Sequence, residues 1–375
     1  MLLELTSDQE FFRETTARFL AEQVPVSRLR ALRDDARGFE GTYWRRGAEL
    51  GWTSLLVGED HGGGSVSGSG LLDLSLIAHE FGRHAAPGPL VPTNVVAGAL
   101  SAGSAHLDLL AALLDGSAVA TWCYGEPRRG LGDVALEVRV EGDELVLDGV
   151  KGPVESADAA THLLVTGRTG GGLTQVVVPA GAPGVAVTPL TSVDLTRRFA
   201  TVRFDGVRVP ADAVLGQVGK ADEDVERQLQ QALVILNAES VGAMESAFGM
   251  TVEWSFDRYS FGRPLASYQA LKHRFAHMKS WLEGAHAISD EAAEAVAAGR
   301  AEGASLASVA KAFVGQYGSE LVQDCVQLHG GIGVTFEHDL HLYLRRHTVD
   351  RALYGTPSEH RLRIVRLMEQ EERAA

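Results

Sequence analysis

The spacing of apolar positions changes twice along the 375-residue chain. In residues 1–118 a helix-capping signal at Thr6–Glu10 is followed by helix-forming residues, and a glycine-rich loop at 60–70 precedes a second helical segment at 71–83. Ser, Thr and Asp favour helix N-termini, whereas Gly-rich runs mark loops. The first 118 residues are therefore predicted to form a helical domain.

Short alternating runs replace the helical pattern in residues 119–218. The segment LEVRVEGDELVLDGV (136–150) alternates on both sides of Gly142-Asp143, which is typical of a hairpin. Further runs rich in Val, Leu and Thr predict strands at 162–168, 174–180, 185–190 and 200–210. This region is predicted to be a β domain.

Apolar residues recur every three or four positions from residue 219 to residue 375. This spacing favours a bundle of long helices. The segments are separated at 263–267, 301–305, 329–338 and 355–358. The expected fold class is therefore α+β, with an N-terminal helical domain, a middle β domain and a C-terminal helical bundle.

Charge and cysteine content exclude several classes of protein. The net charge of −15 disfavours general binding to nucleic acid or an anionic membrane, so an anionic ligand needs a local basic patch. Cys123 and Cys325 lie far apart, which argues against a disulfide scaffold or a cysteine-based metal site. The N-terminus lacks the pattern of a signal peptide, and no apolar run is long enough to span a bilayer. A cytoplasmic protein is expected.

Three segments carry a more specific pattern than the order of elements. Residues 257–278 contain an Arg, a Phe-Gly pair three residues later and a Gln opening the next helix. Residues 326–346 contain QLHGGIG, and residues 194–210 read DLTRRFATVRFDGVRVP. Together these segments resemble the FAD-binding segments and the end of the β domain of the acyl-CoA dehydrogenase family. The resemblance extends to the actinobacterial branch that degrades steroids and other acyl-CoA thioesters and includes α2β2 members.

That resemblance implies a fold, a reaction and an assembly. The family has an N-terminal helical domain, a middle β domain and a C-terminal four-helix bundle, and FAD is its cofactor. Its members desaturate an acyl-CoA at the α and β carbons, and electron-transfer flavoprotein is the expected electron acceptor. They usually form tetramers, in which a neighbouring subunit's bundle completes each FAD site. A homotetramer and a heterotetramer are both open here.

The first set of expected FAD contacts surrounds Arg258. By resemblance, Arg258 binds the pyrophosphate with its guanidinium, Ser260 adds a hydroxyl and Phe261 offers a flat apolar surface. Gln269 matches the family's glutamine at the start of the following helix. The alternative for Arg258 is a solvated charge at a helix end.

The second set consists of Gln327, Gly330 and Gly331, with Thr356 as a weaker match. Two glycines allow a ligand to approach the backbone closely. Glycine is also the usual residue after a helix, so a C-cap is the alternative for this pair. The alternative for Thr356 is a turn or a helix cap.

The β domain departs from the family where it would face the flavin ring. Glu126, Pro127 and Gly130 match a family segment, but its threonine and serine are missing. An aromatic residue and a threonine are usual near residues 153 and 155, and this chain has Pro153 and Glu155 there. These differences put contact between this subunit's β domain and a flavin ring in question.

The catalytic base is also missing from its usual positions. The two positions that usually hold it in the family are Tyr354 and Ala232 in this chain. Glu239 lies seven residues after Ala232, close to two helical turns, and has apolar neighbours on its helix face. A buried carboxylate suits a general base, so Glu239 is the predicted base. A buried structural ion pair is the alternative.

Other acidic and histidine residues have less distinctive settings. Glu155 is a second candidate acid, with a charge on a hairpin surface as its alternative. Glu245 and Glu253 are interpreted as solvated. His338 and His341 are interpreted as part of a polar helix face, and no metal site is predicted.

Two functions follow. The chain is an active FAD-dependent acyl-CoA dehydrogenase with Glu239 as base, or it is a catalytically impaired partner subunit that completes its neighbour's FAD site in an α2β2 assembly. A flavin oxidase or monooxygenase would share the fold, but no residue favours it. Small residues at Ala232, Gly242 and Ala243 favour a bulky acyl group.

Overall fold

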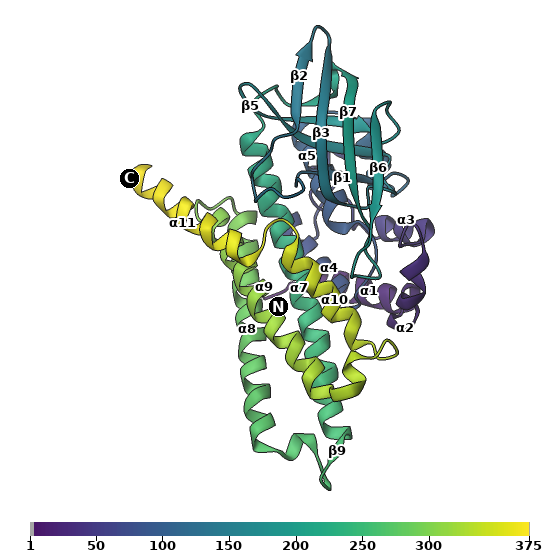
Figure 1. The fold of residues 1–375 in the computed structure, drawn as a ribbon, viewed down its shortest axis with the longest axis vertical. Coiled ribbons are helices and arrows are strands. Elements are labelled where there is room, and N and C mark those ends of the chain that lie inside the picture. Colours follow the sequence, from purple (N-terminus) through teal and green to yellow (C-terminus); the bar gives the residue numbers. More distant parts are fainter. Residues whose placement is uncertain (1–3, 375) are drawn as a thin grey trace. The chain divides into compact units, whose positions relative to one another are not determined.

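The N-terminal part of the chain is helical, as predicted. The computed structural model describes residues 4–374 (Figure 1). Its first helices are α1 (Ser7–Gln23), α2 (Val26–Leu29), α3 (Gly41–Glu49), α4 (Gly70–Arg83), α5 (Leu90–Gly103) and α6 (Leu107–Leu114). The predicted capping signal is confirmed: the Thr6 side chain accepts from the Gln9 backbone, and the Gln9 side chain accepts from the Thr6 backbone.

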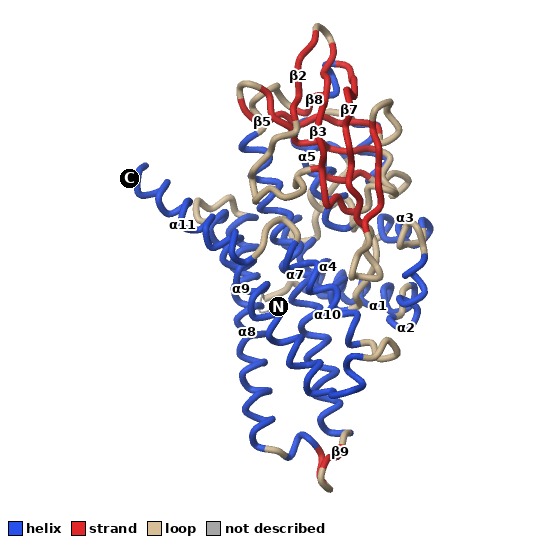
Figure 2. Tube along the Cα trace, viewed as in Figure 1, coloured by secondary structure: helices blue, strands red, loops and turns tan. Residues whose placement is uncertain are grey.

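The middle region forms one sheet. Its strands are β1 (Ala120–Cys123), β2 (Glu137–Glu141), β3 (Glu144–Glu155), β4 (His162–Thr169), β5 (Gly172–Pro179), β6 (Val185–Leu190), β7 (Phe199–Pro210) and β8 (Val214–Leu215). Their order is β6-β7-β3-β2-β4-β5-β8, and β1 pairs with β4. Figure 2 shows these strands as one red group. The predicted hairpin is confirmed, with Glu141 opposite Glu144 and Gly142 at a φ of 66°.

Long helices return at residue 222. They are α7 (Asp222–Asp257), α8 (Gln269–Ala297), α9 (Gly303–His329), α10 (Leu340–Ala352) and α11 (Pro357–Ala374). A small hairpin of β9 (Tyr259–Ser260) and β10 (Arg263–Pro264) connects α7 to α8. Helix α9 packs against α8, α10 and α11 and is therefore the central helix of this group. In residues 4–374 no helix is long and apolar enough to cross a membrane.

The chain divides into two compact units that do not follow these changes of secondary structure. Unit 1 comprises residues 1–30, 75–86 and 233–375, and unit 2 comprises residues 31–74 and 87–232. Two of the boundaries fall inside α4 and α7. The α+β fold class is confirmed, and the division into domains at residues 118 and 218 stays a prediction.

Within unit 1, helices α4 and α7 touch through their backbones. A Cβ on Gly82 would lie 1.8 Å from the Glu239 carbonyl oxygen, and one on Gly242 would lie 2.0 Å from that of His79. No side chain fits at those distances, so the glycines permit the close crossing. This crossing brings His79, Glu80 and Arg83 of α4 beside the middle of α7.

Candidate functional site

The residues expected to hold phosphate gather at one end of the helical bundle. Arg258 follows α7 directly and is exposed, with its guanidinium 6.0 Å from the Trp254 ring centroid. The Trp254 ring stacks on His329 at the end of α9, with centroids 5.4 Å apart. Gly330 is the next residue, so the two expected FAD-contacting segments meet here although about 70 residues separate them. We call this group the bundle-end cluster: Trp254, Arg258, Ser260, Phe261, Gln269, Gln327, His329, Gly330 and Gly331.

The β9–β10 hairpin presents its apolar tip to solvent. Phe261 is 98% exposed with a φ of 48°, and Gln269 is exposed as the first residue of α8. The Ser260 carbonyl accepts a 2.6 Å hydrogen bond from the Tyr268 hydroxyl, which fixes the hairpin against the start of α8. An aromatic ring with this exposure is suited to contact another molecule.

The end of α9 is open to close approach. Gly330 ends the helix with a φ of 67°, so its role as a C-cap is confirmed. A Cβ on Gly330 or Gly331 would meet nothing within 4 Å, and Gln327 is exposed one turn earlier. The C-cap role of Gly330 leaves the backbone open, so it does not conflict with the expected contact with an anionic ligand.

Thr356 lies apart from this cluster. It precedes α11, where its backbone N–H and its hydroxyl both donate to the Glu359 carboxylate at 2.8 Å. Pro357 packs against Gly315 of α9, which lies about 20 Å from the end of that helix at 1.5 Å per residue. Thr356 therefore serves as a helix cap, the alternative given above.

Glu239 occupies a buried ion pair. Its carboxylate accepts from the Arg346 guanidinium, and the two side chains are 2% and 0% exposed. Arg346 also donates to the carbonyl oxygens of Ala85 at 3.2 Å and Ala86 at 2.9 Å. The apolar setting predicted for Glu239 is present, but so is a full charge partner, which is the structural alternative to a base.

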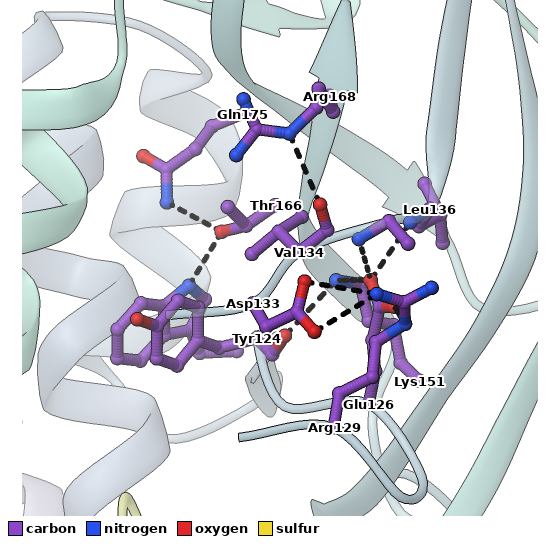
Figure 3. Close-up of polar contacts among 12 residues, drawn as sticks. Tyr124, Glu126, Arg129, Asp133, Val134, Leu136, Lys151, Thr166, Arg168 and Gln175 are labelled. Atoms are coloured by element: carbon purple, nitrogen blue, oxygen red, sulfur yellow. Dashed lines mark hydrogen bonds and ion pairs between the residues drawn. The ribbon is translucent and has the colours of Figure 1, made fainter. Parts of the chain in front are cut away.

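Unit 2 contains a second buried ionic group, centred on Glu126 (Figure 3). Its carboxylate accepts from Lys151 Nζ at 2.8 Å and from the Leu136 N–H at 2.8 Å, and it lies 3.4 Å from Arg129 Nε. Burial lowers the pKa of Lys151, and Glu126 opposes that change. Glu126 thus anchors the loop between β1 and β2, a structural reason for its match to the family.

Glu155, the second candidate acid, is also buried in unit 2, so the alternative of a charge on a hairpin surface is wrong. Its Oε1 lies 3.0 Å from Arg197 Nε, and both side chains are less than 5% exposed. Pro153, two residues earlier, is exposed. The segment therefore offers neither an aromatic face nor a hydroxyl.

The two halves of the expected FAD site differ in their fit. The bundle-end cluster has an exposed guanidinium, open glycine backbone and an exposed aromatic ring, which suit a phosphate and a flat group. The segment 151–155 has its lysine and its glutamate turned into internal ion pairs. The residues present fit FAD from the bundle end, and they do not fit a flavin ring along β3.

One cluster of titratable side chains was not predicted from the sequence. Glu245, interpreted as solvated, lies half-buried with its Oε2 3.0 Å from His79 Nε2 and 3.7 Å from His286 Nε2. The contact with His79 is the largest cause that lowers the pKa of Glu245, to about 2, and burial lowers the pKa of His286 to about 4. The three residues lie on three different helices, so no sequence spacing could have joined them.

The chain order of helices, one β sheet and helices, with an exposed arginine and open glycine backbone at one end of the bundle, is the arrangement expected for a flavin-dependent acyl-CoA dehydrogenase. Family models agree: residues 6–107 match the acyl-CoA dehydrogenase N-terminal domain, and residues 223–368 match the C-terminal domain. The chain belongs to the acyl-CoA dehydrogenase family, whose members are FAD-dependent oxidoreductases.

Individual relatives cover almost the whole chain. Acyl-CoA dehydrogenase IpdE2 of Mycobacterium tuberculosis is 30% identical over 354 residues, 94% of each protein. A solved steroid acyl-CoA dehydrogenase variant, Tcur3481-Tcur3483, is 29% identical with a TM-score of 0.87, covering 98% of this chain and 99% of that one. The ChsE4-ChsE5 complex of Mycobacterium tuberculosis contains a similar fold at 23% identity and a TM-score of 0.87, with coverage of 98% and 99%.

Proposed function

We propose that this chain is the cofactor-completing subunit of a heteromeric acyl-CoA dehydrogenase. In this role its bundle-end cluster contacts FAD held by a neighbouring subunit. The observation that carries the proposal is the pairing of Glu239 with Arg346, because it commits the predicted base to a buried structural contact. The Glu155–Arg197 pair supports it, because a second acid is also withdrawn.

Residues of the bundle-end cluster have separate proposed roles. Arg258 neutralises phosphate charge, and Gly330 and Gly331 allow the ligand close to the backbone. Phe261 covers a flat part of the cofactor, while Ser260, Gln269 and Gln327 supply polar contacts. When bound, FAD supplies the hydride acceptor for dehydrogenation, and the protein supplies orientation and electrostatics. The general base then comes from the other subunit type.

The relatives support a proposal for the substrate and the setting. The 29% identical steroid enzyme favours a bulky, steroid-derived acyl-CoA for the assembly. That enzyme is named as a pair, Tcur3481-Tcur3483, which agrees with a heteromer. Electron-transfer flavoprotein is the proposed electron acceptor. Buried free Cys123 and Cys325 suit a reducing, cytoplasmic location.

An active homotetramer with Glu239 as base is the second candidate. It is favoured by the burial of Glu239 on α7, the helix that also carries Ala232, one of the family's usual base positions. For catalysis the carboxylate would have to leave Arg346. The cost of leaving a buried guanidinium unpaired, about 3–5 kcal/mol, weighs against this.

The visible spectrum separates the two candidates. Purified alone, the chain is expected to lack flavin absorbance and to gain it, together with acyl-CoA dehydrogenase activity, only when co-expressed with a homologous subunit. A yellow homotetramer whose absorbance bleaches with an acyl-CoA would contradict the proposal.

Substitution of Arg258 tests the assigned contact. In the co-expressed assembly, Arg258→Ala is expected to lower flavin retention at least tenfold, because one charge-assisted phosphate contact is lost. Arg227→Ala, at an exposed arginine near the start of α7, is the matched control and should retain the cofactor. Flavin content per tetramer after gel filtration is the measurement, and equal retention in both variants would remove Arg258 from the site.

A further inference from the structure

His79, Glu245 and His286 converge from three helices in unit 1. They lie on α4, α7 and α8, and their ligand-type atoms all lie within 4.8 Å of one another. Both His79 and His286 approach the same carboxylate oxygen of Glu245 with Nε2, at 3.0 and 3.7 Å. Two imidazole nitrogens and one carboxylate oxygen in this arrangement are suited to bind a metal ion together, in addition to forming an ion pair.

We propose that this triad binds a first-row transition-metal dication of the zinc type. Zinc binds histidine nitrogen at about 2.0–2.1 Å and carboxylate oxygen at about 2.0–2.2 Å. In tetrahedral geometry two such ligands lie about 3.4 Å apart. The two separations from Glu245 Oε2, 3.0 and 3.7 Å, bracket this value, and the two histidine ligand atoms lie within 4.8 Å of each other. Movement of the side chains toward a common centre would seat the ion.

The state of the side chains suits a metal. His79 is buried, and neither of its ring nitrogens has a hydrogen-bond partner of good geometry in residues 4–374. The ring contacts the Glu245 carboxylate at 3.0 Å without well-aligned hydrogen-bond geometry, and a metal bond would satisfy Nε2.

Two further charged groups support the triad. Glu80 Oε1 lies 3.8 Å from His79 Nδ1, beyond hydrogen-bond distance but on the side of the ring away from Glu245, where metal-binding histidines usually have a carboxylate. Arg83 lies 3.3 Å from Glu80 Oε2 and 4.0 Å from Glu245 Oε1, so it restrains both carboxylates. Two carboxylates against one guanidinium leave a net negative site for a dication.

The cluster also has an entry path. A cavity of about 520 Å³ opens beside it, lined by Glu245, His286, Arg83, Glu253, Lys279 and Tyr343 among others. Three protein ligands leave the fourth tetrahedral position for a water from this cavity. The bound ion would join α4, α7 and α8, independently of any role in FAD binding.

The test uses the full chain, stripped with a chelator and titrated with Zn²⁺ by calorimetry and with Co²⁺ by visible absorbance. One equivalent per chain is expected, with a raised unfolding temperature in the presence of Zn²⁺. His286→Asn and Glu245→Gln should each weaken binding at least tenfold. His277→Asn, an exposed histidine on the same helix, should bind like the parent protein.

His286→Cys adds a rescue, because a thiolate also binds zinc and gives its Co²⁺ complex a new sulfur charge-transfer band. Should His286→Asn fail to fold, Glu245→Gln and His286→Cys decide by the same criteria. Absence of stoichiometric uptake, or equal affinity in His286→Asn and the parent, would overturn the site and leave a metal-free hydrogen-bonded cluster.

Discussion

At the scale of single residues, Glu239 shows what a sequence can reveal about a buried charge. Its apolar helical neighbours predicted burial, and it is buried. Its partner, Arg346, lies 107 positions away, and no local pattern indicates that the two meet. Exposure of Arg258, Phe261 and Gln327 follows from turn and helix-end signals, whereas ion pairs between distant elements depend on the packing of the whole unit.

Glu239→Gln tests the structural role of the pair. The change leaves Arg346 buried with no opposite charge, so the free energy of unfolding should fall by about 3–5 kcal/mol. Urea denaturation measures it. Glu253→Gln on the same helix is the exposed control and should change stability by less than about 0.5 kcal/mol.

The double variant Glu239→Gln/Arg346→Met removes both charges. It should recover part of the lost stability, because no unpaired charge remains. Unchanged stability in Glu239→Gln together with abolished turnover in the assembled enzyme would instead identify Glu239 as a base.

At the scale of elements, the periodicity predicted helices and strands well but not their contacts. The capping box of α1, the β2–β3 hairpin and the helix at 71–83 are present where expected. The crossing of α4 and α7 was not predicted, because it depends on two small residues from segments about 160 positions apart. The Glu245 cluster was missed for the same reason, since α4 and α8 both contribute to it.

Two glycines on α7 provide a matched comparison. A Cβ at Gly242 would lie 2.0 Å from the His79 carbonyl, and one at Gly249 would meet nothing within 4 Å. Gly242→Ala should therefore destabilise by about 1–3 kcal/mol or more, because backbones must separate. Gly249→Ala should stabilise by about 0.5–1 kcal/mol through helix propensity. Thermal and urea unfolding of both variants measure this, and equal effects would contradict the close crossing.

The cap of α11 gives a second prediction at this scale. Thr356→Ala should lower the free energy of unfolding by about 1 kcal/mol, because the hydroxyl contact with Glu359 is lost. Thr356→Ser keeps that contact and should resemble the parent. A loss of flavin without a change in stability would favour the cofactor role over the cap.

At the scale of the whole molecule, buried histidines couple stability to pH. Burial lowers the pKa of His347 to about 3 and that of His360 to about 4. His347 is held between Ser240 at 2.7 Å and Ser319 at 3.3 Å. Both rings are neutral in the folded state and charge near pH 6.5 when the chain unfolds.

The unfolded chain therefore binds more protons between about pH 6.5 and pH 4. The contribution of these neutral histidines to the free energy of unfolding is complete above about pH 6.5. As the pH is lowered, this contribution should fall by about 1.4 kcal/mol per pH unit for each histidine. His347→Gln should reduce the slope of the free energy of unfolding against pH by the contribution of one histidine. Urea unfolding at several pH values from 5 to 8 measures it, and an identical slope in the variant would show that His347 does not contribute.

The order of helices, strands and helices was predictable from the sequence, since it depends on local periodicity. The two compact units were not, because their boundaries depend on contacts between distant segments. Family membership accounts for the matches in the C-terminal part of the chain. Pro153 and Glu155 differ from the family's usual residues, and Glu155 is held in a buried ion pair with Arg197.

The placement of the unit boundaries inside α4 and α7 has a practical consequence. Most multidomain proteins can be cut apart at exposed linkers, but residues 74–75 and 232–233 lie within hydrogen-bonded helical turns. A protease that requires extended chain should not release either unit intact, and a gene truncated at these points would encode broken helices. Recombination between relatives is expected to succeed at whole-chain length and to fail for half-chain chimaeras.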